Sequence, residues 1–159
     1  MMKPSVYLET SVISYLTARP SRDLIVAAHQ QITHEWWEDR RSEYALYVSQ
    51  FVIQEAANGN AEAAKKRLEI IRDLPILTAA AEVFDLAGLL TTHGPLPKTS
   101  DLDALHLAVA SVSGMDFLVT WNNKHIANAN MRPKIAAICR ASGFEPPTIC
   151  NPEELMGGL

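Results

Sequence analysis

The sequence predicts an α/β fold, a three-layer α/β/α sandwich with a central parallel sheet. Short apolar runs alternate along the chain with longer segments in which apolar residues recur at helical spacing. No internal repeat or interdomain linker interrupts this alternation. The 159 residues are therefore expected to form a single domain, residues 1–159, which is long enough to bury one core.

The alternation begins with an apolar run at residues 6–8, which is expected to be a buried strand. The run stops at Glu9, where the chain is expected to leave the sheet. Either Thr10 or Ser11 is suited to cap a short helix over residues 12–16.

Two more serines are expected to begin helices. Ser21 caps a long helix, and Ser49 caps a shorter one over residues 50–58 that Gly59 closes. Between them, residues 44–48 form the second expected strand. The apolar face of the long helix is predicted from four residues at helical spacing: Ile25, Ala28, Ile32 and Trp36.

The rest of the chain continues the pattern. Further helices are expected over residues 61–72, 79–90, 100–113 and 133–141, and further strands over residues 75–77, 117–120 and 148–149. In parallel sheets of this kind, ligands bind at the carboxyl ends of the strands. Glu9 and Asn122 each follow a strand, so they are expected to lie close together.

The composition is that of a globular protein, with 48% hydrophobic and 20% charged residues. The apolar runs are too short to cross a membrane, and the N-terminus lacks a signal-peptide pattern, so a cytoplasmic protein is expected. Cys139 and Cys150 are expected to be reduced and structural. The net charge of −4 argues against bulk electrostatic attraction to nucleic acid. It does not exclude a nuclease, because divalent cations reverse the local sign of a carboxylate cluster.

Glu55 is the most informative acidic residue. On a helical wheel it projects between Phe51 and Val52, on the apolar side of its helix. A carboxylate buried without partners costs on the order of several kcal/mol, so Glu55 needs an arginine, N–H donors or a metal ion. A structural salt bridge, or a side chain that reaches outward to solvent, is the alternative explanation.

The other acidic positions also have two explanations each. Asp103 begins a helix that is apolar nearly all round, which suits a cleft, but it also suits a capping box with Ser100. The alternative explanation for Glu9 is an acid that the dipole of the next helix stabilises, and the alternative for Asn122 is a simple turn residue after a strand. His106 shares a face with Asp103 and is expected to be a satisfied interior histidine.

Together these positions favour a metal site. Glu9 at a strand end, Glu55 on an apolar helix face and Asp103 at a buried helix start are able to converge. Three or four oxygen ligands in one cleft suit Mg²⁺ or Mn²⁺.

The order of these pieces resembles the PIN domain, and in particular the single-domain bacterial VapC-type toxins. The resemblance runs from residue 6 to about residue 125. It is carried by four motifs: Val6-Tyr7-Leu8-Glu9-Thr10-Ser11, Ser49-Gln50-Phe51-Val52-Ile53-Gln54-Glu55, Ser100-Asp101-Leu102-Asp103-Ala104-Leu105-His106-Leu107-Ala108 and Phe117-Leu118-Val119-Thr120-Trp121-Asn122.

This resemblance implies a Mg²⁺- or Mn²⁺-dependent endoribonuclease that acts on RNA, is held in check by a small antitoxin protein and forms a homodimer. Asp101 is implied as an added acid at the metal site, Thr10 as the residue that orients the Glu9 carboxylate, and Thr120 as a supporting residue. The implied catalytic residues are Glu9, Glu55, Asp103 and Asn122, of which the three acids are metal ligands. The candidate phosphate contacts are Arg19, Arg22, Lys98 and Lys124, and solvated surface charge is the alternative explanation for each of them.

Two positions depart from the family pattern. The family usually has Asp where Glu9 stands, and often an acid where Asn122 stands. Asn122 offers a carbonyl oxygen without charge, which weakens a second metal site. These departures keep open a catalytically silent PIN-like module that binds RNA or protein, and metal chemistry of this kind also suits a phosphatase or deoxyribonuclease.

Overall fold

The computed structural model describes residues 2–157 and contains a single five-stranded parallel sheet. The strand order is β3-β2-β1-β4-β5, so the first strand lies in the centre. Its register pairs Val6 with Leu46 on one side and with Phe117 on the other. The strands are β1 (Ser5–Leu8), β2 (Ala45–Ser49), β3 (Ile76–Leu77), β4 (Phe117–Val119) and β5 (Thr148–Cys150).

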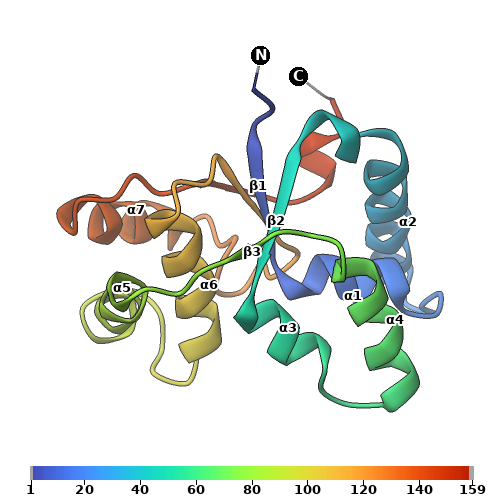
Figure 1. Ribbon diagram of the computed structural model, residues 1–159, viewed down its shortest axis with the longest axis horizontal. Coiled ribbons are helices and arrows are strands. Elements are labelled where there is room, and N and C mark those ends of the chain that lie inside the picture. The colour runs from blue at the N-terminus through green and yellow to red at the C-terminus, as the bar shows by residue number, and fades with distance from the viewer. Residues whose placement is uncertain (1, 158–159) are drawn as a thin grey trace.

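Helices cover both faces of this sheet. Helices α1 to α4 lie on one side and α5 to α7 on the other, which confirms the predicted three-layer arrangement (Figure 1). The α-helices are α1 (Thr10–Thr17), α2 (Leu24–Asp39), α3 (Gln50–Ala56), α4 (Ala61–Ile71), α5 (Ala81–Thr92), α6 (Asp101–Val112) and α7 (Arg132–Ala141). Two short 3₁₀ helices, η1 (Arg41–Glu43) and η2 (Glu153–Leu155), complete the described chain. Within it, no helix is both long and apolar enough to cross a membrane.

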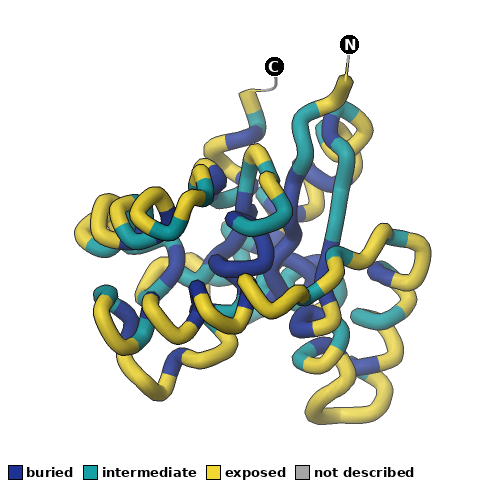
Figure 2. Tube along the Cα trace, turned by 60° about the vertical axis from the view of Figure 1, so that its left-hand side comes forward, coloured by how far each residue is buried: buried dark blue, intermediate teal, exposed yellow. Residues whose placement is uncertain are grey.

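The core is centred on β1 and α6. Val6, Leu8, Leu107 and Val109 are completely buried, and the same central region is dark in Figure 2. This confirms that the apolar helix beginning after Ser100 is an interior element. A buried helix beside a central strand brings the side chains of both into direct contact, so polar groups on either one must find partners inside the protein.

Both cysteines belong to this interior. Cys139 and Cys150 are buried free thiols, and burial raises the pKa of the Cys150 thiol to about 12. Neither forms a disulfide within residues 2–157. Their burial agrees with the predicted structural role.

Helix α2 differs from its prediction in both its cap and its buried face. Asp23, not Ser21, caps it, accepting a hydrogen bond from the Val26 N–H at 3.0 Å. Ile25 is 69% exposed, whereas Thr33 is completely buried. The predicted face is confirmed at Trp36, which is completely buried, and at Ile32, which packs against the core, but it is wrong at Ile25 and Ala28, which are exposed. Polar residues with internal hydrogen bonds take the rest of the buried face, and apolar spacing does not mark them. The buried residues of α2 are Gln30, Thr33, Trp36 and Trp37.

Two other capping predictions were wrong. Glu9 occupies the N-cap position of α1, so Thr10 and Ser11 lie within the helix. Ser100 occupies the N-cap position of α6 but makes no side-chain capping bond, so it forms no capping box with Asp103. In both places the side chains bond to more distant residues instead, and those bonds build the site described next.

Candidate metal centre

The acidic residues meet at the carboxyl edge of the sheet. Glu9 follows β1 directly, and its backbone N–H donates to the carbonyl oxygen of Val119, the last residue of β4, at 3.1 Å. The chain adds β2 and β3 on one side of β1 and then crosses to add β4 and β5 on the other. Such a switch point leaves a crevice between neighbouring strand ends, which is where open α/β sheets bind ligands.

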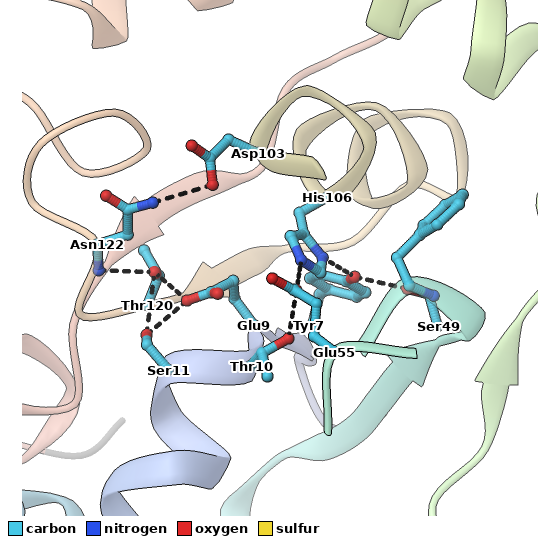
Figure 3. Close-up of polar contacts among 11 residues, drawn as sticks. Tyr7, Glu9, Thr10, Ser11, Ser49, Glu55, Asp103, His106, Thr120 and Asn122 are labelled. Carbon is cyan, nitrogen blue, oxygen red and sulfur yellow. Dashed lines mark hydrogen bonds and ion pairs between the residues drawn. The ribbon is translucent and has the colours of Figure 1, made fainter. Parts of the chain in front are cut away.

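Hydroxyl groups from two segments fix the Glu9 carboxylate. Ser11 and Thr120 each donate to its Oε1 at 2.5 Å (Figure 3). Glu9 is only 5% exposed and Thr120 is completely buried. Within residues 2–157, Oε2 of Glu9 makes no hydrogen bond, so the carboxylate is oriented by one oxygen and keeps the other for a ligand.

The Glu55 carboxylate is also held through one of its oxygen atoms. Thr10 donates to Oε1 of Glu55 at 2.7 Å, and Nε2 of His106 lies 2.5 Å from the same oxygen. The Glu55 side chain is 29% exposed. Partial burial raises its pKa, but the hydrogen bonds from His106 and Thr10 outweigh this, and the pKa lies below its ordinary value. The carboxylate form therefore predominates at neutral pH.

This contact corrects the role expected of Thr10. It was implied to orient Glu9, but its hydroxyl bonds Glu55. The physical reason is the helix start: with Glu9 at the N-cap, Thr10 begins α1 and its hydroxyl reaches α3, while Ser11 turns back to Glu9.

Asp103 belongs to an adjoining group. Its Oδ1 accepts a hydrogen bond from the Asn122 amide at 3.0 Å, and its Oδ2 lies 2.9 Å from Nδ1 of His125. The Asn122 backbone N–H donates to the Thr120 hydroxyl at 2.9 Å, and this hydroxyl in turn donates to Glu9. Asp103 is thus linked to Glu9 through Asn122 and Thr120, and the expected proximity of Glu9 and Asn122 is confirmed.

The tightest grouping of possible ligand atoms comes from Glu9, Glu55 and His106. One ligand atom from each lies within 4.8 Å of the others. In the described part of the chain, no lysine or arginine forms a salt bridge with Glu9, Glu55 or Asp103. Two oriented carboxylates that lack a lysine or arginine partner suit a divalent cation, and their oxygen atoms are the donors that Mg²⁺ and Mn²⁺ prefer. The residues present therefore fit the metal that the resemblance implies.

The remaining implied residues lie outside this grouping. Asp101 is exposed at the start of α6 and borders a hollow between α5 and α6, lined also by Ala87 and Thr91. The structure therefore does not bring it to Glu9 and Glu55. The four candidate phosphate contacts are all exposed and form no ion pair among residues 2–157: Arg19, Arg22, Lys98 and Lys124.

Several residues of the site were not singled out from the sequence. Ser11 bonds both Glu9 and the backbone N–H of Trp121, and His125 bonds Asp103. His106 is completely buried with both ring nitrogens bonded, which confirms the prediction of a satisfied interior histidine. The sequence does carry a signal that Tyr7 lies beside the site. Tyr7 is two residues before Glu9 in an extended segment, so the two side chains lie on the same face.

Comparison with solved structures supports the fold. The chain superposes on VapBC2 from Rickettsia felis, solved bound to a DNA fragment from their promoter, with a TM-score of 0.57 and 16% identity, covering 92% of this chain and 97% of that chain. It also superposes on VapC20 from Mycobacterium tuberculosis, described as a sarcin-ricin loop cleaving toxin, with a TM-score of 0.57 and 17% identity, covering 90% and 100%. No protein-family profile and no curated protein sequence matches it. The chain has the fold of the VapC toxins, the PIN-domain fold that its sequence resembles.

Proposed function

We propose that the chain is a Mg²⁺- or Mn²⁺-dependent endoribonuclease that hydrolyses RNA phosphodiester bonds at the candidate metal centre. The observation that carries the proposal is the pairing of Glu9 and Glu55. Both carboxylates are oriented by hydroxyl donors, and neither forms a salt bridge with a lysine or arginine within residues 2–157. Among residues 2–157, the structural salt bridge that is the alternative for Glu55 is formed with no basic residue other than His106.

The residues have distinct proposed roles. Glu9, Glu55 and Asp103 are the metal ligands, and Asn122 completes the catalytic set by holding Asp103. A divalent ion bound here would acidify an attacking water and neutralise charge that develops on the phosphate. The chain itself supplies the orientation: Ser11 and Thr120 fix Glu9, and Thr10 and His106 fix Glu55. Ligands fixed in this way lose little conformational freedom when the ion binds.

We also propose a protein partner and a role as the toxin of a toxin–antitoxin pair. The support is the structural likeness to VapBC2 and to the toxin VapC20. Apolar side chains left exposed on the fold are consistent with a small antitoxin and with a homodimer, because large exposed apolar groups commonly mark contact surfaces. Among residues 2–157 these side chains include Leu24, Ile25, Ile76 and Phe84.

One observation favours the alternative of a catalytically silent module. The Asn122 amide donates to Asp103, so at this position the site holds a neutral hydrogen-bond donor in place of a further acid. An RNA- or protein-binding role would retain the fold and the exposed basic residues without hydrolysis.

Cleavage of single-stranded RNA separates the two functions. The purified protein is incubated with RNA and Mg²⁺ or Mn²⁺, with EDTA, with Asp103→Asn and with the exposed control Asp85→Asn. We expect cleavage by wild type and Asp85→Asn, no cleavage in EDTA, and a loss of at least about 100-fold in Asp103→Asn, comparable to removing one preorganised charge-stabilising group. RNA left intact by wild type with both metals supports the silent module, and cleavage in EDTA contradicts the metal mechanism.

A further inference from the structure

A continuous chain of hydrogen bonds runs from the start of α3 to Glu55. The Phe51 backbone N–H donates to Oγ of Ser49 at 3.2 Å, and Oγ of Ser49 lies 2.7 Å from the Tyr7 hydroxyl. The Tyr7 hydroxyl lies 2.6 Å from Nδ1 of His106, and Nε2 of His106 reaches Glu55 (Figure 3). The side chains of Ser49, Tyr7 and His106 are completely buried, so water does not supply alternative partners to them.

The direction of each bond follows from counting hydrogens. The Phe51 N–H donates to Oγ of Ser49. The Ser49 hydrogen has one possible acceptor among the described residues, the Tyr7 oxygen, so it is satisfied only if Ser49 donates to Tyr7. The Tyr7 hydrogen then has one acceptor left among the described residues, the Nδ1 atom of His106.

The other proton arrangements leave buried groups unpaired. If Nδ1 of His106 carried the hydrogen, the Tyr7 hydrogen would turn to Ser49, and the Ser49 hydrogen would have no acceptor within residues 2–157. If Nε2 lacked a hydrogen, its lone pair would face the Glu55 carboxylate at 2.5 Å. Both arrangements bury an unsatisfied or repulsive polar contact, which native proteins avoid.

We propose that His106 is a positioning residue: its Nε2–H holds Glu55, its Nδ1 accepts from Tyr7, and it does not itself bind the cation. This inference rests on the proposed function for its significance, because Glu55 is a proposed metal ligand. The proposal gives His106 a different role from Glu9 and Glu55, which are proposed to bind the metal, although one ligand atom from each of the three lies within 4.8 Å of the others. Oε1 of Glu55 accepts from both Thr10 and His106, and Oε2 remains for the metal.

Nitrogen NMR of the histidine rings tests the bonding pattern without any assay of activity. In metal-free, ¹⁵N-histidine-labelled protein, we expect His106 to show a protonated Nε2 and an unprotonated, hydrogen-bonded Nδ1, assigned by the signals that disappear in His106→Gln. We expect Nε2 to keep its proton when diamagnetic Mg²⁺ is added. A protonated Nδ1 in the metal-free protein, or loss of the Nε2 proton with Mg²⁺, overturns the proposal.

A tyrosine pair provides the matched control. Tyr7→Phe removes the hydroxyl that bonds His106, whereas Tyr44→Phe removes a buried hydroxyl that has no partner among the described residues. We expect the Mg²⁺ dissociation constant, measured by calorimetry, to rise about 10-fold in Tyr7→Phe and to stay unchanged in Tyr44→Phe. An equal effect of the two substitutions contradicts a positioning role.

The outcomes separate this inference from the proposed function. If the NMR pattern and the binding effect are found but RNA is not cleaved, the ribonuclease fails and the positioning role stands. If RNA is cleaved while Nδ1 of His106 is protonated, the positioning role fails and the ribonuclease stands. If Mg²⁺ does not bind at all, the metal centre fails, and the metal-free spectrum alone decides how His106 is bonded.

Discussion

Hydroxyl groups hold two of the three proposed ligand carboxylates. Ser11 and Thr120 bond Glu9, and Thr10 bonds Glu55. A hydroxyl donor orients a carboxylate without cancelling its charge, whereas an arginine or lysine would satisfy it electrostatically and compete with a cation. At the scale of single residues, the site is therefore built to leave negative charge uncompensated.

Substitution of Thr120 tests this arrangement. Thr120→Val keeps the shape of the side chain but removes the donor to Glu9 and the acceptor for the Asn122 N–H. We expect the free energy of unfolding to fall by about 1–3 kcal/mol, because a partly buried N–H loses its partner and the buried Glu9 carboxylate loses a donor. We also expect Mn²⁺ binding to weaken. Urea denaturation and calorimetry measure the two effects.

Thr17→Val is the matched control for this prediction. Among the described residues, the Thr17 hydroxyl bonds only to carbonyl oxygens within α1, those of Ile13 and Ser14. We expect little change in stability or Mn²⁺ binding. Equal effects of the two substitutions would show that Thr120 has no special role at the site.

Single elements show which parts of the fold are readable from sequence. All five strands and seven α-helices were predicted, because apolar runs and helical spacing mark them directly. The details of α2 were not predictable in this way. Gln30 is buried because its side chain bonds the Ser21 N–H and the Arg19 carbonyl oxygen. Thr33 is buried because its hydroxyl accepts a hydrogen bond from the indole N–H of Trp121. Burial that depends on distant polar partners leaves no periodic apolar signal.

The cap of α2 provides a direct test at this scale. Asp23→Ala removes the side chain that accepts from the Val26 N–H. We expect a loss of about 1 kcal/mol in the free energy of unfolding, the usual value for an N-cap carboxylate. Ser21→Ala, at the position that the sequence indicated, removes only an exposed acceptor for the Asp23 N–H and is expected to cost less. A larger loss in Ser21→Ala contradicts the assignment of the cap.

The whole molecule brings together residues that are far apart in sequence. Thr120 and Glu9 are separated by 111 positions, and His106 and Glu55 by 51. The sequence predicted that Glu9, Glu55 and Asp103 would converge. Glu9 and Glu55 lie together, and Asp103 lies in an adjoining group with Asn122 and His125. The sequence did not indicate that Thr10 would bond Glu55, or that Asp101 would be exposed beside α5, because a side chain's partner depends on the neighbouring helix's rotation and depth.

Titration of metal-free protein with Mn²⁺, followed by calorimetry, tests the central claim that these carboxylates form a divalent-cation site. The variants are Glu9→Gln and Glu55→Gln, which keep an oxygen able to accept the observed hydroxyl bonds, with the exposed Glu69→Gln as control. We expect wild type and Glu69→Gln to bind equally, and each site variant to bind at least about 10-fold more weakly. No binding by wild type, or equal binding by all four folded proteins, would contradict the account.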